Sequence, residues 1–128
     1  MTQSSVYKGP GIFLAAGAGV TPFIAINRHL AHEGKIASNS LIFSNKTPKD
    51  IICEKELRHY FQSRCILTCT RKSAFGYDNR RITPELLKEK IRDFHQHFYV
   101  CGPDAFVGQT KTALTELGAK PNTVVFEE

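Results

Sequence analysis

The chain has 128 residues, of which 41% are hydrophobic and 23% are charged, with a formal net charge of +5. This length and composition are ordinary for one globular domain, and no apolar run approaches the roughly 20 residues that a membrane span needs. The first residues lack the basic-then-apolar order of a secretory signal, so we expect a cytoplasmic protein. The positive charge suits an anionic ligand or an acidic partner. The sequence lacks the basic stripe interleaved with aromatic residues that would indicate nucleic-acid binding.

The cysteines and histidines give no sign of a disulfide or a metal site. The four cysteines form no C-x-x-C pair and no cluster with histidine. Cys65 and Cys69 lie on one face of a predicted strand, about 13 Å apart, which is too far for a disulfide. Reduced thiols are therefore expected. His95 and His97 lack a third ligand nearby in sequence, so we expect no metal.

Strand-like and helix-like segments alternate from one end of the chain to the other. Apolar periodicity and turn residues predict strands at 12–16, 40–44, 65–70, 98–101 and 124–126, and helices at 22–33, 47–60, 83–91 and 103–117. The strands are apolar throughout, which is typical of a parallel sheet covered on both faces. We therefore expect an α/β fold, a three-layer doubly wound sandwich with a five-stranded parallel sheet. Its ligand should bind outside the carboxyl ends of the strands, where strand order reverses.

The segment from Gly17 to Pro22 follows the first predicted strand and precedes the first predicted helix. A strand, a glycine turn and a helix start point backbone N–H groups at a phosphate. Glycine permits positive φ and close approach of an anion to the main chain, and Pro22 fits a first helical turn. We expect the hydroxyl of Thr21 to cap the helix. No third glycine follows, which separates this turn from the G-x-G-x-x-G of ordinary dehydrogenases.

Further segments fall at carboxyl ends of the predicted strands: Ser44-Asn45-Lys46, Thr70-Arg71 and Cys101-Gly102-Pro103-Asp104. Glycine and proline after a buried strand make a sharp turn into the next helix, which would bring the Cys101 thiol to the rim of the ligand crevice. A small buried apolar cysteine is the alternative for this residue.

Taken together, residues 9–23, Tyr99-Val100-Cys101-Gly102-Pro103 and residues 124–128 resemble the pyridine-nucleotide-binding domain of the ferredoxin–NADP reductase superfamily. Residues 44–51 resemble the segment after the second strand in its bacterial flavodoxin or ferredoxin reductase-like members. The likeness covers essentially the whole chain in order. It implies a two-domain flavoprotein in which a barrel domain holds FAD or FMN and the present type of domain holds NAD(P)H. Hydride then passes from nicotinamide to flavin, and electrons leave for a ferredoxin- or flavodoxin-type carrier.

The resemblance also implies positions for the cofactor. The pyrophosphate and the nicotinamide side would be surrounded by Gly17, Ala18, Gly19, Val20, Thr21 and Pro22. Cys101 would lie beside the nicotinamide C4 as a spacer and polariser rather than a nucleophile, on a turn shaped by Gly102, Pro103 and Asp104. Glu127 matches an acidic residue in the family's tail and would relay a proton or face a partner. A solvated terminal carboxylate is the alternative for Glu127.

Charge after the second and third strands favours NADP over NAD. Ser44, Asn45 and Lys46 are followed by no acid until Asp50, and Thr70 is followed by Arg71 and Lys72. An NAD-selective site usually offers a carboxylate to the adenosine ribose, whereas a 2′-phosphate calls for basic or hydroxyl groups. Solvated loop charges are the alternative.

The flavin half is expected elsewhere, in cis or in trans. The family's barrel domain carries the motif Arg-x-Tyr-Ser/Thr. Residues 58–61 resemble that motif only superficially, because they lie in a predicted helical segment and lack the final hydroxyl residue. We expect residues 1–8 to be the remnant of an interdomain linker and 9–128 to be the NAD(P)-binding domain. A non-catalytic nucleotide-binding or regulatory module is the alternative function. A flavodoxin-like carrier is disfavoured because the first turn has neither an acidic cluster nor a Ser/Thr-rich phosphate loop.

Overall fold

The computed structural model describes residues 7–71, 73–120 and 124–126. Strands and helices alternate along these residues, as the sequence predicts. In chain order they are β1 (Gly11–Ala16), α1 (Thr21–His32), β2 (Ser40–Asn45), α2 (Glu54–Phe61), β3 (Cys65–Cys69), α3 (Pro84–Lys90), β4 (His97–Cys101), α4 (Asp104–Glu116) and β5 (Val124–Phe126).

All neighbouring strands pair in parallel, and their order across the sheet is β3-β2-β1-β4-β5. Four strands of five or six residues form the body of the sheet, and the three-residue β5 pairs with the outer side of β4. The chain runs outward from β1 to β3 and then crosses back to β4, so strand order reverses between β1 and β4. The α/β class with a parallel sheet is confirmed.

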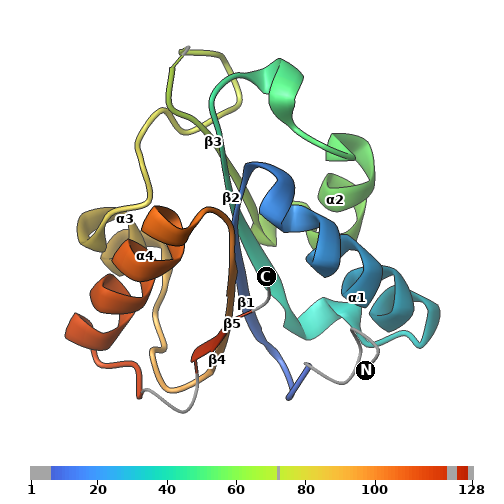
Figure 1. Ribbon diagram of the computed structural model, residues 1–128. Coiled ribbons are helices and arrows are strands. Elements are labelled where there is room, and N and C mark those ends of the chain that lie inside the picture. Colours follow the sequence, from blue (N-terminus) through green and yellow to red (C-terminus); the bar gives the residue numbers. More distant parts are fainter. Residues whose placement is uncertain (1–6, 72, 121–123, 127–128) are drawn as a thin grey trace.

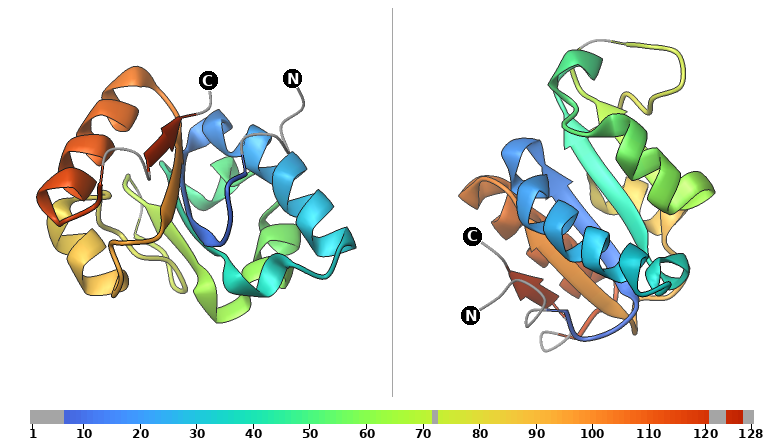
Figure 2. Two further views of the ribbon diagram at one scale, coloured as in Figure 1. Left: turned by 90° about the horizontal axis from the view of Figure 1, so that it is seen from below. Right: turned by 90° about the vertical axis from the view of Figure 1, so that its right-hand side faces the viewer.

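Helices cover the sheet on both faces, with α1 and α2 on one side and α3 and α4 on the other (Figures 1 and 2). Neighbouring residues of β1 point into opposite layers. Phe13 belongs to the core under α1 and α2, and Leu14 belongs to the core under α3 and α4. Both side chains are fully buried, and each such burial contributes about 1.5–3 kcal/mol. A sheet that buries both faces leaves no polar face, which explains the apolar strands.

Tyr99 fixes the segment that leads into β1. Its ring stacks on Tyr7 and on Phe13, at centroid distances of 5.6 and 4.7 Å. Its hydroxyl accepts hydrogen bonds from the backbone N–H groups of Lys8 and Gly9, at 2.8 and 3.0 Å, and donates one to the Gly9 carbonyl at 2.7 Å. Residues 7–9 therefore enter the domain on a fixed path beside β4.

The helix expected over 47–60 is wrong in its first half. A 3₁₀ turn covers Pro48–Asp50, and α2 begins only at Glu54. The Asp50 carboxylate accepts hydrogen bonds from the backbone N–H and the hydroxyl of Thr47, which closes the short turn on itself. Cys53 then adopts a left-handed conformation with φ of 54°, so the chain stops and restarts. Thr83 caps α3, because its hydroxyl accepts a hydrogen bond from the Leu86 N–H at 3.3 Å.

The described part of the chain contains no helix long and apolar enough to cross a bilayer. None of the four cysteines, all within the described residues, is in a disulfide. Burial raises the pKa of the Cys65 thiol to about 11, which makes it a poor nucleophile at neutral pH.

Candidate functional site

The turn after β1 opens toward solvent at the carboxyl edge of the sheet. Gly17 has φ of +57°, and a side chain there would meet nothing within 4 Å. Gly17–Val20 forms a 3₁₀ turn, and Pro22 lies in the first turn of α1. Because Gly17 is left-handed and has open space beside it, the turn exposes main chain where a phosphate could approach.

The expected cap by Thr21 is wrong. The 3₁₀ turn extends to Val20, which occupies the cap position of α1 and makes no side-chain cap hydrogen bond. Thr21 itself has helical dihedral angles, φ −55° and ψ −48°, and its N–H donates to the Ala18 carbonyl. A residue already inside the helix cannot place its hydroxyl in the capping geometry, which needs extended backbone.

The turns after β1 and β4 interlock through two glycines. A Cβ on Gly19 would lie 2.5 Å from the Cys101 carbonyl oxygen and 2.7 Å from the Gly102 Cα. A Cβ on Gly102 would lie 2.8 Å from the Phe106 ring and 3.3 Å from the Ala16 Cβ. The structure therefore brings two of the sequence-predicted segments into direct contact at the strand-order reversal.

Cys101 ends β4 beside this contact, but its side chain does not line an open rim. It is 4% exposed and belongs to the core under α1 and α2. The register pairs Cys101 with Ala15, so the carbonyl of Cys101 faces Gly19 while the thiol lies among apolar side chains. Pro103 and Asp104 follow at the cap and first position of α4, as expected for a sharp turn.

The ends of β2 and β3 are held together beyond the last ladder pair. The N–H groups of Thr70 and Arg71 donate to the carbonyls of Asn45 and Lys46, each at 2.9 Å. Ser44 is the register partner of Ala16, the last residue before the glycine turn. The structure thus gathers the expected Ser44-Asn45-Lys46 and Thr70-Arg71 segments along one edge, next to the glycine turn.

Asn45 has an unmet hydrogen-bonding requirement. The residue is 5% exposed, and neither its amide nitrogen nor its amide oxygen has a hydrogen-bond partner among the described residues. Buried polar atoms in folded proteins are nearly always paired, so this amide calls for a partner that the protein does not supply. The sequence pointed to Asn45 only by its place at a strand end.

Lys46 and Arg71 carry positive charge at this edge without an ion pair to any described residue. Of the acids nearest in sequence, Glu54 is paired with Arg58 at 2.8 Å and Asp78 with Arg80 at 2.7 Å, while Asp50 accepts hydrogen bonds from Thr47. Two exposed cations without ion pairs at this edge favour an anionic ligand.

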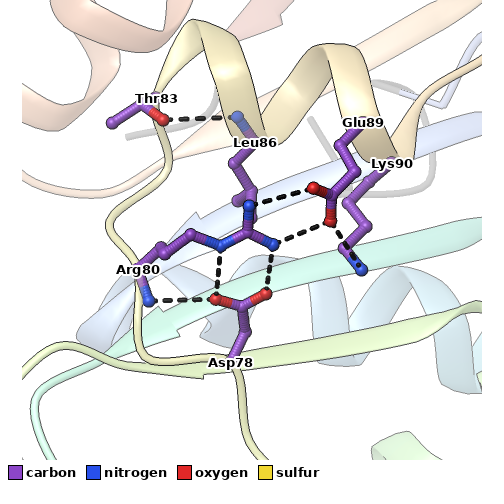
Figure 3. A network of polar contacts seen from close by, with 6 residues as sticks. All are labelled: Asp78, Arg80, Thr83, Leu86, Glu89 and Lys90. Carbon is purple, nitrogen blue, oxygen red and sulfur yellow. Dashed lines mark hydrogen bonds and ion pairs between the residues drawn. The ribbon is translucent and has the colours of Figure 1, made fainter.

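Residues 73–82 form a connection to α3 that passes above the carboxyl ends of β2 and β3 (Figure 1). A network at its far end ties it to α3 (Figure 3). Arg80 donates to both carboxylate oxygens of Asp78, at 3.0 and 2.7 Å, and to both of Glu89, at 3.1 and 2.8 Å. The hydrogen-bonded guanidinium holds the pKa of Asp78 and that of Glu89 at about 2.

Three expected features fall where the structure gives no description. Glu127, Lys72 and residues 1–6 of the expected linker lie outside the described residues.

Fold and site together define a class of protein. A parallel α/β sheet with a glycine turn, a helix start and a second close-packed turn at the strand-order reversal is the construction of a nucleotide-binding domain. Residues 13–112 match the family model of the oxidoreductase NAD-binding domain, and the chain belongs to that family.

Curated relatives agree with the family. The chain is 32% identical over 130 residues to cytochrome b5 reductase 4 of Xenopus tropicalis, covering 91% of this chain and 25% of the relative. It is 30% identical over 107 residues to NADH oxidoreductase HCR of Escherichia coli, covering 84% of this chain and 32% of the relative. The chain thus spans only a part of each curated relative.

Solved structures share the fold. The FAD/NAD-binding domain of nitric oxide dioxygenase from Vibrio cholerae superposes with a TM-score of 0.84 at 22% identity, over 94% of this chain and 51% of that one. The CS-b5R domains of human Ncb5or, in the NAD+ form, give a TM-score of 0.78 at 24% identity, over 98% of this chain and 38% of that one.

Proposed function

We propose that this chain is the NAD(P)H-binding half of a flavin-dependent reductase. The observation that carries the proposal is the interlock of Gly19 with the Cys101–Gly102 backbone at the reversal between β1 and β4. In this assignment residues 17–22 hold the pyrophosphate, and the nicotinamide lies against the turn at 101–104. The open space beside Gly17 and the unpartnered amide of Asn45 fit a polar ligand at this edge.

The proposal takes residues 9–128 as one ferredoxin reductase-like unit, a doubly wound sandwich whose fifth strand is β5. Residues 1–8 lead in from a flavin-binding domain in cis, or that domain acts in trans. The short span of this chain within its relatives, and the FAD named in a solved neighbour, support a separate flavin domain. A ferredoxin- or flavodoxin-type carrier is the proposed onward acceptor.

The bound dinucleotide supplies the hydride, and the chain supplies placement. The turn at 101–104 sets the depth at which the nicotinamide ring rests, because no side chain protrudes from Gly102. Cys101 is proposed as a spacer that acts at this turn through its main chain, since its thiol is buried in the core under α1 and α2. Glu127 is proposed as a proton relay or a partner-facing carboxylate.

We assign NADP as the preferred dinucleotide. Lys46 and Arg71 are cations without ion pairs at the edge where the adenosine ribose would lie, and no carboxylate in residues 44–46 or 70–71 would receive a 2′-hydroxyl. A 2′-phosphate meets both cations with charge-assisted hydrogen bonds.

Calorimetric titration with NADPH and NADH tests the function and the preference together. We expect NADPH to bind more tightly than NADH, and Lys46→Ala and Arg71→Ala each to weaken NADPH by about tenfold, the usual value of one charge-assisted hydrogen bond. Arg92→Ala removes an exposed cation beyond α3 and should leave binding unchanged. If Lys46→Ala and Arg71→Ala kept the same ratio of NADPH to NADH affinity as the unaltered chain, the assignment to NADP would be overturned.

A second measurement separates the enzyme half from a binding module. The chain alone should show little diaphorase activity and should gain it when a flavin domain of this superfamily is added. Nucleotide binding without such a gain would favour the non-catalytic module. A tightly bound flavin in the purified chain would refute the separate flavin domain.

A further inference from the structure

Gly102, in the turn that follows β4, is enclosed from two directions. The glycine turn after β1 lies in one of them, because a Cβ on Gly19 would lie 2.7 Å from the Gly102 Cα. The aromatic ring of Phe106 lies in the other, because a Cβ on Gly102 would lie 2.8 Å from that ring. Both distances are shorter than van der Waals contact between carbon atoms. The Phe106 ring therefore occupies the space that a side chain at position 102 would take.

The Phe106 ring is held in place by the start of α4. This helix begins at Asp104, beside the carboxyl edge of the sheet (Figure 1). Pro103 holds the cap position, and its carbonyl accepts a hydrogen bond from the Val107 N–H at 3.0 Å, which closes the first helical turn. The ring is partly buried and packs against the core under α3 and α4. Because helix and core both fix it, the ring forms a firm support behind Gly102.

Ala16 links this support to the glycine turn a second time. It is the last residue of β1, and a Cβ on Gly102 would lie 3.3 Å from the Ala16 Cβ. The Phe106 ring, the Gly102 main chain and the turn after β1 are thus in contact one after another. Interiors packed this closely transmit a displacement from one group to the next. Removing the ring would leave a void behind Gly102, and the turn at 101–104 would be free to move into it.

We propose that Phe106 is a positioning residue for the nicotinamide end of the dinucleotide, because its ring sets the distance between the Gly102 main chain and the glycine turn. The inference rests on the proposed function and identifies what fixes its geometry. Phe106 acts through Gly102 and needs no contact with the ligand. Hydride transfer requires reacting atoms held about 3–3.5 Å apart, so a small displacement of the supporting turn is costly.

A double-mutant cycle tests the contact itself. Gly102→Ala should destabilise the chain because the added methyl group meets the Phe106 ring, and Phe106→Ala should destabilise it because of the void. In the double variant the methyl group enters the space that the ring has left. The loss of stability in urea unfolding should therefore be smaller than the sum of the two single losses. Additive losses would contradict the contact and overturn the proposal.

Ligand binding distinguishes positioning from packing. NADPH carries the nicotinamide, whereas adenosine 2′,5′-bisphosphate lacks it. Phe106→Ala should raise the Kd for NADPH by about fivefold, the order of one lost element of preorganisation, and leave the Kd for the bisphosphate unchanged. The rise in nicotinamide emission when NADPH binds should also become smaller, because the ring is no longer held away from water. Phe106→Leu refills much of the void and should restore most of both signals.

Phe94→Ala is the matched control. Phe94 is also partly buried against the core under α3 and α4, but it precedes β4 and so lies at the opposite end of that strand from Gly102. This variant should lose stability and still bind NADPH with unaltered emission. If Phe106→Ala weakens both ligands equally, or neither, the positioning role is wrong while the proposed function stands. If the unaltered chain binds no dinucleotide, both are wrong.

Discussion

The two halves of the carboxyl edge are constructed in different ways. Between β1 and β4 the edge is made of main chain, and Gly19 and Gly102 leave no room for side chains. Between β2 and β3 it is made of side chains: the cations Lys46 and Arg71, the unpartnered amide of Asn45 and an anchored loop. The first half should therefore be sensitive to shape, and the second to charge and hydrogen bonding. Substitutions should harm the fold in the first half and ligand affinity in the second.

Gly19→Ala is the strongest test of the first half. Its Cβ would lie 2.5 Å from the Cys101 carbonyl oxygen, a main-chain atom that cannot move aside alone. Separating the two turns should cost about 3 kcal/mol or more, the upper part of the range for overpacking, and should abolish NADPH binding. Urea unfolding measures the stability, and calorimetry measures the binding.

The matched control is Gly108→Ala. Gly108 lies inside α4, and a Cβ there meets nothing within 4 Å. Alanine exceeds glycine in helix propensity by roughly 1 kcal/mol, so this variant should be slightly more stable than the parent and bind equally. Equal stability of the Gly19→Ala and Gly108→Ala variants would contradict the interlock.

The same contrast explains what the sequence could predict. The order of elements followed from apolar strands and glycine or proline boundaries, because periodicity records burial directly. The turn at 17–22 could be predicted because glycine residues in the sequence indicate where another group must approach the main chain closely. Its contact with Gly102 was not, since it depends on how two strands 80 or so residues apart are placed side by side. The burial of the Cys101 thiol depends likewise on which face of β4 meets α1.

The second half could be predicted only in part. Lys46 and Arg71 could be predicted as site residues because they follow strand ends. No local sequence pattern predicts that the Arg80 guanidinium hydrogen-bonds Asp78 and Glu89. The helix expected from 47 failed for a similar reason, because the Asp50 side chain closes a short turn that competes with helix continuation. Side-chain pairings of this kind are decided by tertiary placement.

Asn45→Leu tests the second half with an intermediate effect. The buried amide lacks partners within the described protein, so an isosteric apolar side chain should leave stability equal or raise it by about 1 kcal/mol. If the amide serves the ligand, the Kd for NADPH should rise by about tenfold at the same time. A more stable variant with weaker binding is the expected signature. Lower stability with unchanged binding would mean that Asn45 is structural.

The smallest effect is expected from removing the Arg80 network that ties the loop to α3, measured as a change in how the free energy of unfolding depends on pH. The Arg80 guanidinium holds the pKa of Asp78 at about 2, below the ordinary value of about 3.9. A carboxyl whose pKa is lower in the folded state stabilises the fold above its unfolded pKa. That contribution disappears as pH falls from about 4 toward about 2. Arg80→Gln should therefore flatten the acid side of the stability profile only slightly, because solvent screens an exposed pair.

Arg28→Gln separates this anchor from a general loss of surface ion pairs. Arg28 hydrogen-bonds Glu56 of α2 and lowers the pKa of that carboxyl to about 2, so its loss should flatten the acid side in the same way. Only Arg80→Gln removes the link between the loop and α3, and so only Arg80→Gln should also weaken NADPH binding. Thermal unfolding between pH 2 and 7, paired with calorimetry at pH 7, distinguishes the two variants. Equal binding by both would limit the Arg80 network to stability and leave the ligand-facing half of the edge to Asn45, Lys46 and Arg71.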